Sequence, residues 1–521
     1  MGKEMKENCL HLIDRGRRSL LGWNIGLSLL ILSVTLALGA ILVAALDLPS
    51  ADGPLRRPRN YDFYPSGMEP RPSVFASEAT LLASETPTRT LFLPFVVKAY
   101  PTHVVDSSFG VQLYYDWYTQ AETIAKMGAS WIRIPLNWSQ HEPENTTPAN
   151  YQWPAGFGEG LAQLSTRNIN VILTLSGNPS WAADYPAGPV HNTDDLREFM
   201  VAAVQHYGKP PYNVKYWEIY NEPDNADPFY ASYGWGYFGY KPLAYVAILS
   251  AIYEPMKTAD PEAQIVFGGI AYDNWTTTGG PFIKAFPDDV LVNGAGAYFD
   301  VMNFHYYILF HQEWDPYGPG VIGKYNFLRD KLASYGLSKP FVCTEASMWS
   351  DEAHSGSEEL QSRYVPQVFA QTMAAGLQTT IWFMFIDEDG PGVYKYGLLN
   401  PDSSPKPAYF SYQILDRQLA GAEYLVTLDP AEDGSGQIEA YEFTVPDSPA
   451  HVIVAWSRDE ASHPMSVKTA QLVQVDRLGN ETTFYADPDG FVRLDVGSCS
   501  DGAVQLTIGR CPVFLRFQPA D

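Results

Sequence analysis

The chain has 521 residues, which is more than one ordinary hydrophobic core organises and indicates two or three domains. Hydrophobic residues make up 46% of it and aromatic residues 14%, enough to fill a large core. With 34 Lys and Arg against 59 Asp and Glu the net charge is −25, and this acidic balance argues against a nucleic-acid partner, since phosphate binding needs clustered basic residues.

The first feature along the chain is a charge-free apolar run from Leu20 to Leu46. It is long enough to cross a bilayer as a helix, which takes about 20 residues. Because Arg15, Arg17 and Arg18 precede it, the positive-inside rule predicts a cytoplasmic N-terminus over residues 1–19 and an external remainder. We therefore expect a single-pass transmembrane signal anchor in the cell membrane. A cleaved signal peptide is the alternative, and it would secrete the protein.

Residues 47–98 are rich in Pro, Ser and Thr and show no hydrophobic period, so we interpret them as a linker. Near the other end of the chain, Cys499 and Cys511 flank one short segment, and in an exported protein this spacing allows a hairpin disulfide. No spacing of Cys and His resembles a metal site, and we expect neither a metal nor another cofactor.

Residues 99–420 alternate short apolar runs with helical stretches, which favours a (β/α)8 TIM barrel. A doubly wound open sheet is the alternative, but no Gly-rich phosphate loop follows the first strand. The predicted strands are Gly110–Leu113, Trp131–Pro135, Asn170–Leu175, Val214–Tyr220, Gln264–Phe267, Phe299–Phe304, Phe341–Thr344 and Thr380–Phe385. The predicted helices are Tyr118–Met127, Gly158–Arg167, Asp194–Tyr207, Leu243–Ala259, Pro281–Phe286, Tyr325–Tyr335, Glu358–Ala375 and Tyr409–Leu419.

Residues 421–521 have a different texture, with short apolar runs divided by Gly, Pro and Asp and without a helical period. This pattern predicts an all-β sandwich domain. The predicted strands are Leu425–Leu428, Ile438–Val445, Val452–Trp456, Ala470–Val475, Thr483–Tyr485, Phe491–Val496, Val504–Ile508 and Val513–Phe517.

Polar side chains stand where the predicted barrel strands end, which is where a TIM barrel places its chemistry. Asn221 and Glu222 follow the fourth strand, Pro223 stops it, and Glu345 follows the seventh. Two carboxylates across the barrel mouth suit glycoside hydrolysis, in which one protonated carboxyl serves the leaving oxygen and one ionised carboxylate attacks the anomeric carbon. Arg133, in the second strand, is placed to keep Glu345 ionised.

His305 and Tyr307 follow the sixth strand, and Trp382 lies in the eighth. Each of these residues also has a purely structural interpretation: a satisfied core histidine for His305, barrel packing for Trp382, and a strand-end salt bridge for Arg133. Tyr306 and Tyr307 are adjacent, so the sequence does not decide which of them faces the site.

The barrel resembles glycoside hydrolase clan A, the retaining barrels with glutamates after strands four and seven. Pro-Ser-Trp and Asn-Glu-Pro, with the trailing sandwich, are most similar to family 39, and family 5 is close behind. The residues that carry the resemblance are Trp131-Ile-Arg133, Trp138 with Glu142-Pro143, Asn178-Pro-Ser-Trp181, Trp217-Glu-Ile-Tyr-Asn-Glu-Pro223, Asn303-Phe-His-Tyr-Tyr307, Thr344-Glu345 and Ile381-Trp-Phe383.

The resemblance implies a retaining hydrolase of β-linked glycosides or polysaccharides, with Glu222 as acid/base and Glu345 as nucleophile. Asn221 would hold the sugar 2-hydroxyl, and Trp382 would form the floor of the reactive-sugar subsite. His305 and Tyr307 would support the nucleophile. The full set of implied substrate-binding residues is Arg133, Asn221, Trp181, His305, Tyr307 and Trp382.

Two other functions fit the same residues. A transglycosidase would use them to transfer a sugar to an acceptor other than water. A non-catalytic glycan-binding protein at the cell surface would use only the fold, since fold does not fix function, but the presence of both glutamates argues against it. The sugar, the linkage and the oligomeric state do not follow from the sequence.

Overall fold

The computed structural model describes residues 107–114, 117–390, 393–428 and 437–520. The cytoplasmic N-terminus, the membrane anchor and the linker that we predict over residues 1–98 lie outside this part of the chain. Among the described residues, none of the helices is both long enough and apolar enough to span a membrane.

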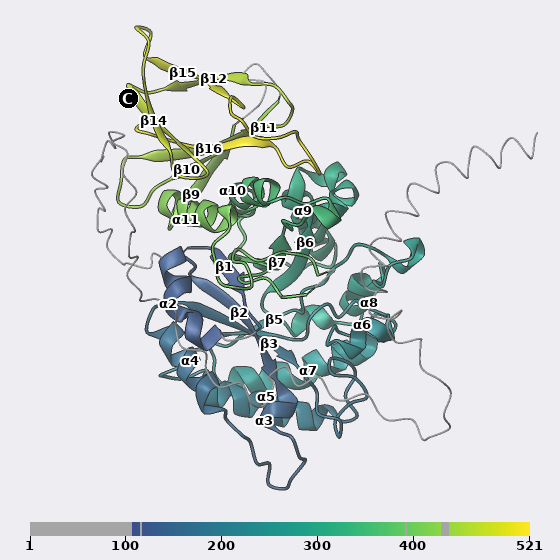
Figure 1. Ribbon diagram of the computed structural model, residues 1–521. Coiled ribbons are helices and arrows are strands. Elements are labelled where there is room, and N and C mark those ends of the chain that lie inside the picture. The colour runs from purple at the N-terminus through teal and green to yellow at the C-terminus, as the bar shows by residue number, and fades with distance from the viewer. Residues whose placement is uncertain (1–106, 115–116, 391–392, 429–436, 521) are drawn as a thin grey trace, which may run out of the picture.

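Eight parallel strands form one sheet in the order β5-β4-β3-β2-β1-β8-β7-β6. The two ends of this order, β5 and β6, meet through the parallel bridges Val266–Val301 and Ile270–Phe304, which close the sheet into the predicted barrel (Figure 1). The strands are β1 (Phe109–Gln112), β2 (Trp131–Asn137), β3 (Asn170–Ser176), β4 (Tyr216–Glu218), β5 (Gln264–Val266), β6 (Met302–Tyr307), β7 (Phe341–Ser347) and β8 (Thr379–Trp382).

The inside of the barrel is a packed apolar core. Trp131, Ile172 and Ile381 form one buried cluster, and Val266, Val301 and Val342 form another. Both clusters pack against Tyr216. The interior therefore supports the mouth from below, as is usual for this fold.

Helices follow the strands and surround the barrel (Figure 1). The α-helices are α2 (Trp117–Met127), α3 (Trp138–His141), α4 (Ala155–Ser165), α5 (Thr193–Tyr207), α6 (Pro228–Ser232), α7 (Pro242–Ala259), α8 (Phe286–Val292), α9 (Gly320–Ser334), α10 (Glu358–Ala374) and α11 (Pro407–Leu419). Short 3-10 helices are Thr276–Thr278, Ala295–Ala297, Ile308–Glu313, Asp315–Tyr317 and Glu352–His354.

Local sequence explains where the well-predicted helices begin. The Asn192 side chain accepts a hydrogen bond from the Asp194 N–H at the start of α5, and the Ser357 side chain accepts from Leu360 at the start of α10. The prediction of a helix over Pro281–Phe286 is wrong, because the Pro281 carbonyl accepts from the Ala226 N–H and ties this segment to the loop after β4. The helix α8 begins at Phe286, which is the last residue of the predicted segment.

The C-terminal region is the predicted all-β domain, with a six-stranded antiparallel sheet in the order β14-β13-β16-β11-β10-β9 and a pair β12-β15. Two details differ from the prediction: β12 was missed, and Val504–Ile508 is a loop. The loop holds Leu506 and Thr507 at φ 51° and 62°, which no extended strand adopts. The strands are β9 (Glu423–Thr427), β10 (Ile438–Thr444), β11 (His451–Ser457), β12 (His463–Lys468), β13 (Gln471–Asp476), β14 (Glu481–Tyr485), β15 (Phe491–Val496) and β16 (Arg510–Phe517).

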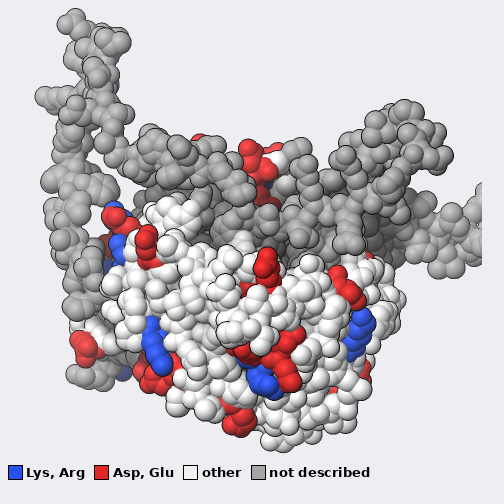
Figure 2. Space-filling view, turned by 90° about the horizontal axis from the view of Figure 1, so that it is seen from below, with Lys and Arg blue, Asp and Glu red and all other residues white. Residues whose placement is uncertain are grey.

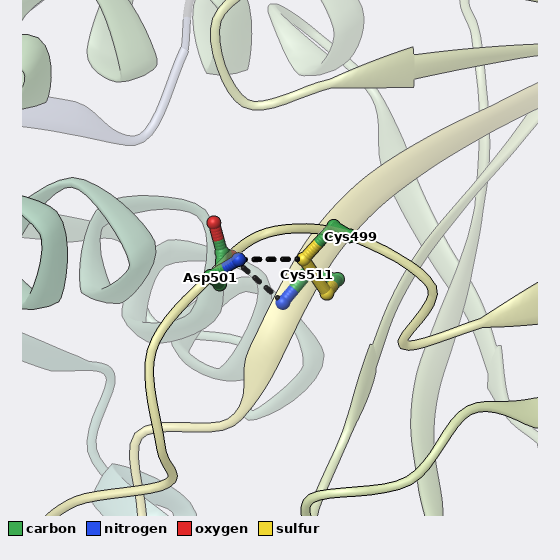
Figure 3. A group of neighbouring side chains, drawn as sticks. All are labelled: Cys499, Asp501 and Cys511. Atoms are coloured by element: carbon green, nitrogen blue, oxygen red, sulfur yellow. Dashed lines mark hydrogen bonds between the residues drawn. A yellow bond between two sulfur atoms is a disulfide. The ribbon is translucent and has the colours of Figure 1, made fainter.

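A disulfide fixes the loop before β16. Cys499 and Cys511 are joined, so the pairing that the spacing allowed is present (Figure 3). Between them, the Asp501 carboxylate accepts from the Cys511 N–H at 3.0 Å and from Arg477 Nη1 at 2.6 Å. Because both sulfurs are in the disulfide, this group of side chains offers no thiolate to a metal ion.

The sheets dock on the barrel through α10, which lies with α11 at the junction (Figure 1). Arg363 of α10 donates to the carbonyls of Gly502 and Ala503 at 2.9 and 3.0 Å. Gln367 both donates to and accepts from the Gly509 backbone, at 2.9 and 3.0 Å. The face of α10 that points away from the barrel is therefore buried by the C-terminal domain.

Figure 2 shows the molecule from below, on the side opposite the C-terminal sheets. On the described part of this face, acidic side chains gather in small groups with a few basic ones beside them, and no continuous basic patch is seen. The charge of this face therefore follows the acidic composition of the whole chain.

Candidate active site

The site stands on the apolar interior of the barrel. Side chains alternate along a strand, so the residue two positions after an interior residue also points inward. Trp131, Ile172 and Ile381 point into the barrel. Arg133 lies two residues after Trp131, and Thr174 lies two residues after Ile172, so both also point inward. Counted in this way over six strands, the inward residues are Arg133, Thr174, Glu218, Asn303, Thr344 and Phe383.

We call the five polar residues of this set the lower layer, and we call Asn221, Glu222, His305, Tyr307 and Glu345 above them the upper layer. Thr344 and Glu345 are neighbours in sequence and yet both face the site. A register shift between Cys343 and Ala346 in the pairing of β7 with β8 interrupts the alternation and allows this.

Arg133 joins the two layers. Its Nε lies 2.6 Å from Glu218 Oε2, and its Nη2 lies 2.9 Å from Glu218 Oε1. Its Nη1 donates to Glu345 Oε1 at 2.7 Å and to Gln112 Oε1 at 2.8 Å. Its Nη2 also donates to Asn221 Oδ1 at 2.7 Å. One buried guanidinium thus holds side chains from β1, β4 and β7. The contact with Glu345 is the one that the sequence predicts for Arg133.

Glu218 is fully buried at the centre of the lower layer, and hydrogen-bond donors reach both oxygens of its carboxylate. Its Oε1 accepts from the Gly269 N–H at 3.0 Å and from Asn303 Nδ2 at 2.8 Å. Its Oε2 accepts from the Thr174 hydroxyl at 2.6 Å, in addition to Arg133. Such a carboxylate is held in place on both oxygens and has no free position for a substrate.

Glu345 is held by two donors. Arg133 reaches its Oε1, and the Tyr307 hydroxyl donates to its Oε2 at 2.7 Å. Burial raises the pKa of Glu345, while the charge of Arg133 and the hydrogen bonds from Tyr307 and Arg133 oppose this rise. Tyr307 is thus the tyrosine that faces the site. The Tyr306 side chain is fully buried, and its hydroxyl has no hydrogen-bond partner among the described residues.

Glu222 has a different environment. Its Oε1 lies 3.0 Å from His305 Nδ1, and its Oε2 has no hydrogen-bond partner among the described residues. Burial, the charge of Glu345 and the nearby Asp224 and Asp273 raise the pKa of Glu222 well above its usual range. The charge of Arg133 lowers the pKa of Glu222, but this effect is smaller than each of the effects that raise it. The proton of the pair therefore belongs on Glu222, and Glu345 ionises first.

The loop that carries Glu222 is strained and firmly held. Tyr220 and Glu222 adopt φ 63° and 47°, in the left-handed region that favours glycine. Asp224 fixes the turn from behind by accepting from the backbone N–H groups of Ala271 and Tyr272, at 3.2 and 2.8 Å. Strain of this kind persists where the surrounding structure over-determines the backbone, and it is common at active sites.

Glu222, His305 and Glu345 each bring one side-chain atom within 4.8 Å of the other two. The three side chains are buried, and a cation among them would lie beside the Arg133 guanidinium, which is 2.7 Å from Glu345. The geometry suits two interacting carboxyl groups better than a metal centre. The same geometry brings the predicted pair, Glu222 and Glu345, to one point of the mouth.

Two predicted sugar-binding residues lie outside this cluster. Trp382 is fully buried and points away from the barrel axis toward Tyr364 of α10, because Ile381 takes the inward position. Its indole N–H donates to the Tyr396 carbonyl at 3.0 Å. Trp181 is half-buried on the loop after β3, and its indole N–H donates to the Glu142 carbonyl at 3.3 Å.

Phe383 stands where we expected Trp382. Its ring lies 6.4 Å from the ring of Tyr307, 6.0 Å from that of Tyr114 and 5.4 Å from that of Tyr396, measured between centroids. The aromatic side chain that accompanies the upper layer is thus Phe383, directly after β8. It lies one residue beyond the expected position because Ile381 points into the barrel and the alternation then turns Trp382 outward and Phe383 inward.

The lower layer was missed as a functional unit. The sequence analysis gives Glu218, Thr174 and Asn303 no role in the site, although Glu218 and Asn303 stand in motifs that carry the resemblance. The available signal was a charged residue inside the apolar run Val214–Tyr220, since a charge in a buried strand must be paired. Arg133, two residues after an apolar strand start, carries the opposite charge and is its partner.

Comparisons with known proteins agree with this architecture. The solved structure of a family 39 glycoside hydrolase from Bacteroides cellulosilyticus WH2 is 19% identical with a TM-score of 0.59, over 79% of this chain and 81% of that chain. The family 39 enzyme from Xanthomonas axonopodis pv. citri is 15% identical with a TM-score of 0.54, over 80% and 94%. A monomeric beta-xylosidase from Caulobacter crescentus CB15 is 14% identical with a TM-score of 0.53, over 80% and 97%. At these identities the likeness establishes the fold. No curated protein matches the sequence.

The sequence itself matches a family model. The model is described as cellulase (glycosyl hydrolase family 5), and it covers residues 94–382, more than half of the chain. This is the family that the sequence resemblance placed second, and it belongs to the clan that the resemblance named. The protein is therefore a glycoside hydrolase, and its chain belongs to the cellulase family, glycosyl hydrolase family 5.

Proposed function

We propose that the protein is a retaining hydrolase of β-linked glycosides or polysaccharides, with Glu345 as nucleophile and Glu222 as acid/base. The observation that carries the proposal is the contrast between two neighbouring carboxyl groups. Glu345 accepts from Arg133 and Tyr307, whereas Glu222 has one oxygen at His305 and one without a described partner. A retaining pair stands about 5–5.5 Å apart, whereas an inverting pair stands about 6.5–9.5 Å apart to admit a water. One oxygen of Glu222 and one of Glu345 lie within 4.8 Å of each other, and His305 Nδ1 lies 3.0 Å from Glu222 Oε1 and 3.6 Å from Glu345 Oε2. This closeness of the two carboxyl groups favours the shorter, retaining separation.

In the first step, the ionised Glu345 attacks the anomeric carbon and forms a glycosyl ester. The bond from this carbon to the leaving oxygen breaks, and Glu222 supplies the proton that this oxygen needs to depart as an alcohol. Arg133 and Tyr307 orient the attacking carboxylate. As the charge of Glu345 is lost in the ester, the repulsion that kept Glu222 protonated falls, which favours release of the proton at this stage.

In the second step, Glu222 is ionised and acts as the base. It takes a proton from a water molecule, and the water oxygen attacks the anomeric carbon and displaces Glu345. The ester bond breaks, the product keeps the anomeric configuration of the substrate, and both glutamates return to their first state. Two inversions at one carbon give net retention.

Asn221 is the residue that we assign to the sugar 2-hydroxyl. Its Oδ1 accepts from Arg133, so its amide nitrogen is turned away from the guanidinium. No hydrogen bond from the described part of the chain engages that nitrogen. We assign the aromatic contact beside the reactive sugar to Phe383 rather than to Trp382, and we keep Trp181 as a residue that contacts a more distant part of the substrate.

We also propose that residues 20–46 anchor the enzyme in the cell membrane, with the barrel outside. The charge-free run behind Arg15, Arg17 and Arg18 supports this placement. The protein should fractionate with membranes, and protease applied to intact cells or spheroplasts should release the barrel by cutting within residues 47–98. A soluble mature chain that begins near Ala45 would show a cleaved signal peptide instead.

The experiment that tests the proposal is a panel of aryl β-glycosides and polysaccharides, followed by proton NMR of the first product of the best substrate. We expect the β-anomer to appear first and to mutarotate afterwards. A first-formed α-anomer would contradict the double displacement. Sugar found on an added acceptor rather than on water would show a transglycosidase that uses the same two residues.

A further inference from the structure

A chain of hydrogen bonds runs from β7 through β6 to Glu222, and its directions can be assigned. It begins at the backbone N–H of Thr344, which can only donate and lies 3.2 Å from Asn303 Oδ1. The amide oxygen of Asn303 therefore faces Thr344, and its nitrogen donates to Glu218 Oε1 at 2.8 Å. The reverse orientation of this fully buried amide would set two N–H groups against each other and its oxygen against a carboxylate.

The next member is the Thr344 hydroxyl. Its Oγ1 lies 3.0 Å from Asn303 Oδ1 and 3.3 Å from Glu218 Oε1, and both of these atoms are acceptors. Its single hydrogen is directed at one of them. The lone pairs of Oγ1 are then left for the third neighbour, His305 Nε2, at 3.2 Å. A contact between Oγ1 and Nε2 is attractive only if Nε2 carries a hydrogen.

His305 is neutral, because burial and the charges of Arg133 and Lys324 hold its pKa well below the usual range. A neutral imidazole has one N–H, which the Thr344 hydroxyl assigns to Nε2, so Nδ1 presents a lone pair. Nδ1 lies 3.0 Å from Glu222 Oε1 and 3.6 Å from Glu345 Oε2. The short contact is a hydrogen bond only when Glu222 is the donor.

Within the described part of the chain, Thr344 Oγ1 is the hydrogen-bond partner of His305 Nε2, and the packing leaves no room for another. Gly269 lies against this contact so closely that a Cβ there would stand 2.2 Å from His305 Nε2 and 2.8 Å from Thr344 Oγ1. The His305 side chain is fully buried, and so is Thr344. If the ring carried its hydrogen on Nδ1 instead, Oγ1 would have to donate to Nε2 and would face two acceptors with lone pairs.

We propose that Thr344 is a positioning residue that sets the tautomer of His305 and thereby keeps the proton of the acid/base on Glu222. The proposal rests on the proposed function, in which Glu222 is the acid/base. The tautomer serves both steps of the reaction. Before bond cleavage, His305 Nδ1 accepts from the protonated Glu222. After Glu222 has given its proton to the leaving oxygen, the same lone pair faces an ionised carboxylate, which favours removal of a proton from water by Glu222.

Other charged and titratable groups near Glu222 act together with this tautomer. Glu345, Asp224 and Asp273 favour the protonated form, and Arg133 favours the ionised form. These groups are unchanged by a substitution at Thr344, so the contribution of the tautomer can be measured against them. The phenols that face Glu222 from the surrounding loops and strands are Tyr114, Tyr230, Tyr307 and Tyr396.

The test uses two substitutions in the full chain. Thr344→Val keeps the shape of the side chain and removes its hydroxyl, whereas Thr344→Ser keeps the hydroxyl. In Thr344→Val the imidazole hydrogen can move to Nδ1 and donate to an ionised Glu222, which stabilises the charged form. We expect the basic limb of kcat/KM to move to lower pH by about one unit, and we expect Thr344→Ser to keep the parent's basic limb. A lower kcat in Thr344→Val without any shift of this limb would overturn the proposal.

A second measurement on the parent protein needs neither the Thr344 variants nor turnover. Two-bond proton–nitrogen correlations of 15N-histidine-labelled protein distinguish the two tautomers and the imidazolium, and the signal of His305 is assigned by its loss in His305→Gln. We expect a neutral ring with the hydrogen on Nε2. A hydrogen on Nδ1, or a charged ring at neutral pH, would overturn the proposal even if the enzyme is active. The Nε2 tautomer in a protein without glycosidase activity would keep the tautomer assignment and refute the proposed function.

Discussion

The lower and the upper layer of polar side chains in the barrel differ in burial and in how far their hydrogen bonds are completed. All five residues of the lower layer are buried, whereas Asn221 and Tyr307 of the upper layer are half-buried. In the lower layer, both oxygens of Glu218 accept hydrogen bonds from several donors. Every nitrogen of the Arg133 guanidinium donates to a side chain of the site. In the upper layer, the buried Glu222 Oε2 has no partner among the described residues. The amide nitrogen of the half-buried Asn221 makes no hydrogen bond within the described part of the chain. Buried polar groups are normally paired, and the exceptions require an explanation. A substrate that completes the upper layer is such an explanation.

The comparison separates residues that hold the site from residues that act. A substitution in the lower layer should cost stability, because it leaves a buried charge or donor unpaired. A substitution in the upper layer should cost activity and little stability, since active sites commonly exchange stability for function. The predictions below test this division, from the largest expected effect to the smallest.

The largest effect is expected for Glu345→Ala. The substitution removes the atom that bonds to the sugar, so activity on every substrate should fall by about 10⁴-fold or more. Added azide or formate should restore some turnover by direct attack on the anomeric carbon, with an inverted product. Initial rates and NMR of the product measure both effects. Near-parental rates in this variant would refute the role of Glu345.

Glu222→Ala should discriminate between leaving groups. Substrates with poor leaving groups should lose about 10²–10⁴-fold in rate, because only these need protonation to depart. A dinitrophenyl glycoside should lose far less in its first step. Azide should rescue this variant with retention, since it attacks the glycosyl ester on Glu345. An equal loss for good and poor leaving groups would argue against Glu222 as the acid.

Glu218→Gln tests the lower layer. It leaves the buried Arg133 without the charge that faces it on two nitrogens, and breaking a buried ion pair in this way costs about 3–5 kcal/mol of unfolding free energy. Denaturant unfolding measures the cost. A matched control is Asp330→Asn, which removes a carboxylate from an exposed pair with Arg329 and should stay within about 0.5 kcal/mol of the parent. Equal stability of the two variants would show that the lower layer does not hold the site.

Gln367→Ala tests the junction between α10 and the C-terminal sheets. It removes two hydrogen bonds to the backbone of Gly509 and leaves that N–H and that carbonyl unpaired, at a cost of about 1–3 kcal/mol. Thermal unfolding should shift, while kcat per folded molecule should stay at the parental value, because Gln367 lies outside both layers. A fall in kcat without loss of stability would link the junction to catalysis.

The sequence predicts the barrel well because its strands are buried on both faces and therefore appear as short apolar runs. The sandwich is predicted less well at two places. Strand β12 (His463–Lys468) alternates exposed and buried residues and contains Pro464, so no apolar run marks it. The run Val504–Ile508 looks like a strand, but hydrogen bonds to residues far away in the sequence hold it: the Val504 N–H donates to Glu460, and the Gln505 side chain donates to the Ser355 carbonyl. No local pattern encodes such contacts.

The site shows the same division between local and tertiary information. Glu222 and Glu345 could be predicted because each follows an apolar run, and the ends of such runs can be found along the chain. Glu218 was hidden in a strand, and its importance depends on Arg133, 85 residues away in sequence. The choice between Trp382 and Phe383 depends on which residue of β8 faces the interior. Only the packing of Ile381 against residues of other strands decides this.

The most direct measurement of the central claim is to trap the covalent intermediate. A 2-deoxy-2-fluoro glycoside with a good leaving group, made from the sugar that the substrate panel identifies, should form the ester quickly and hydrolyse it slowly. Mass spectrometry of the digested protein should find one added fluorosugar on the peptide that contains Glu345, and Glu345→Gln should remain unlabelled. The account predicts this label together with time-dependent loss of activity. A label on another residue, or full inactivation without any covalent sugar, would contradict it.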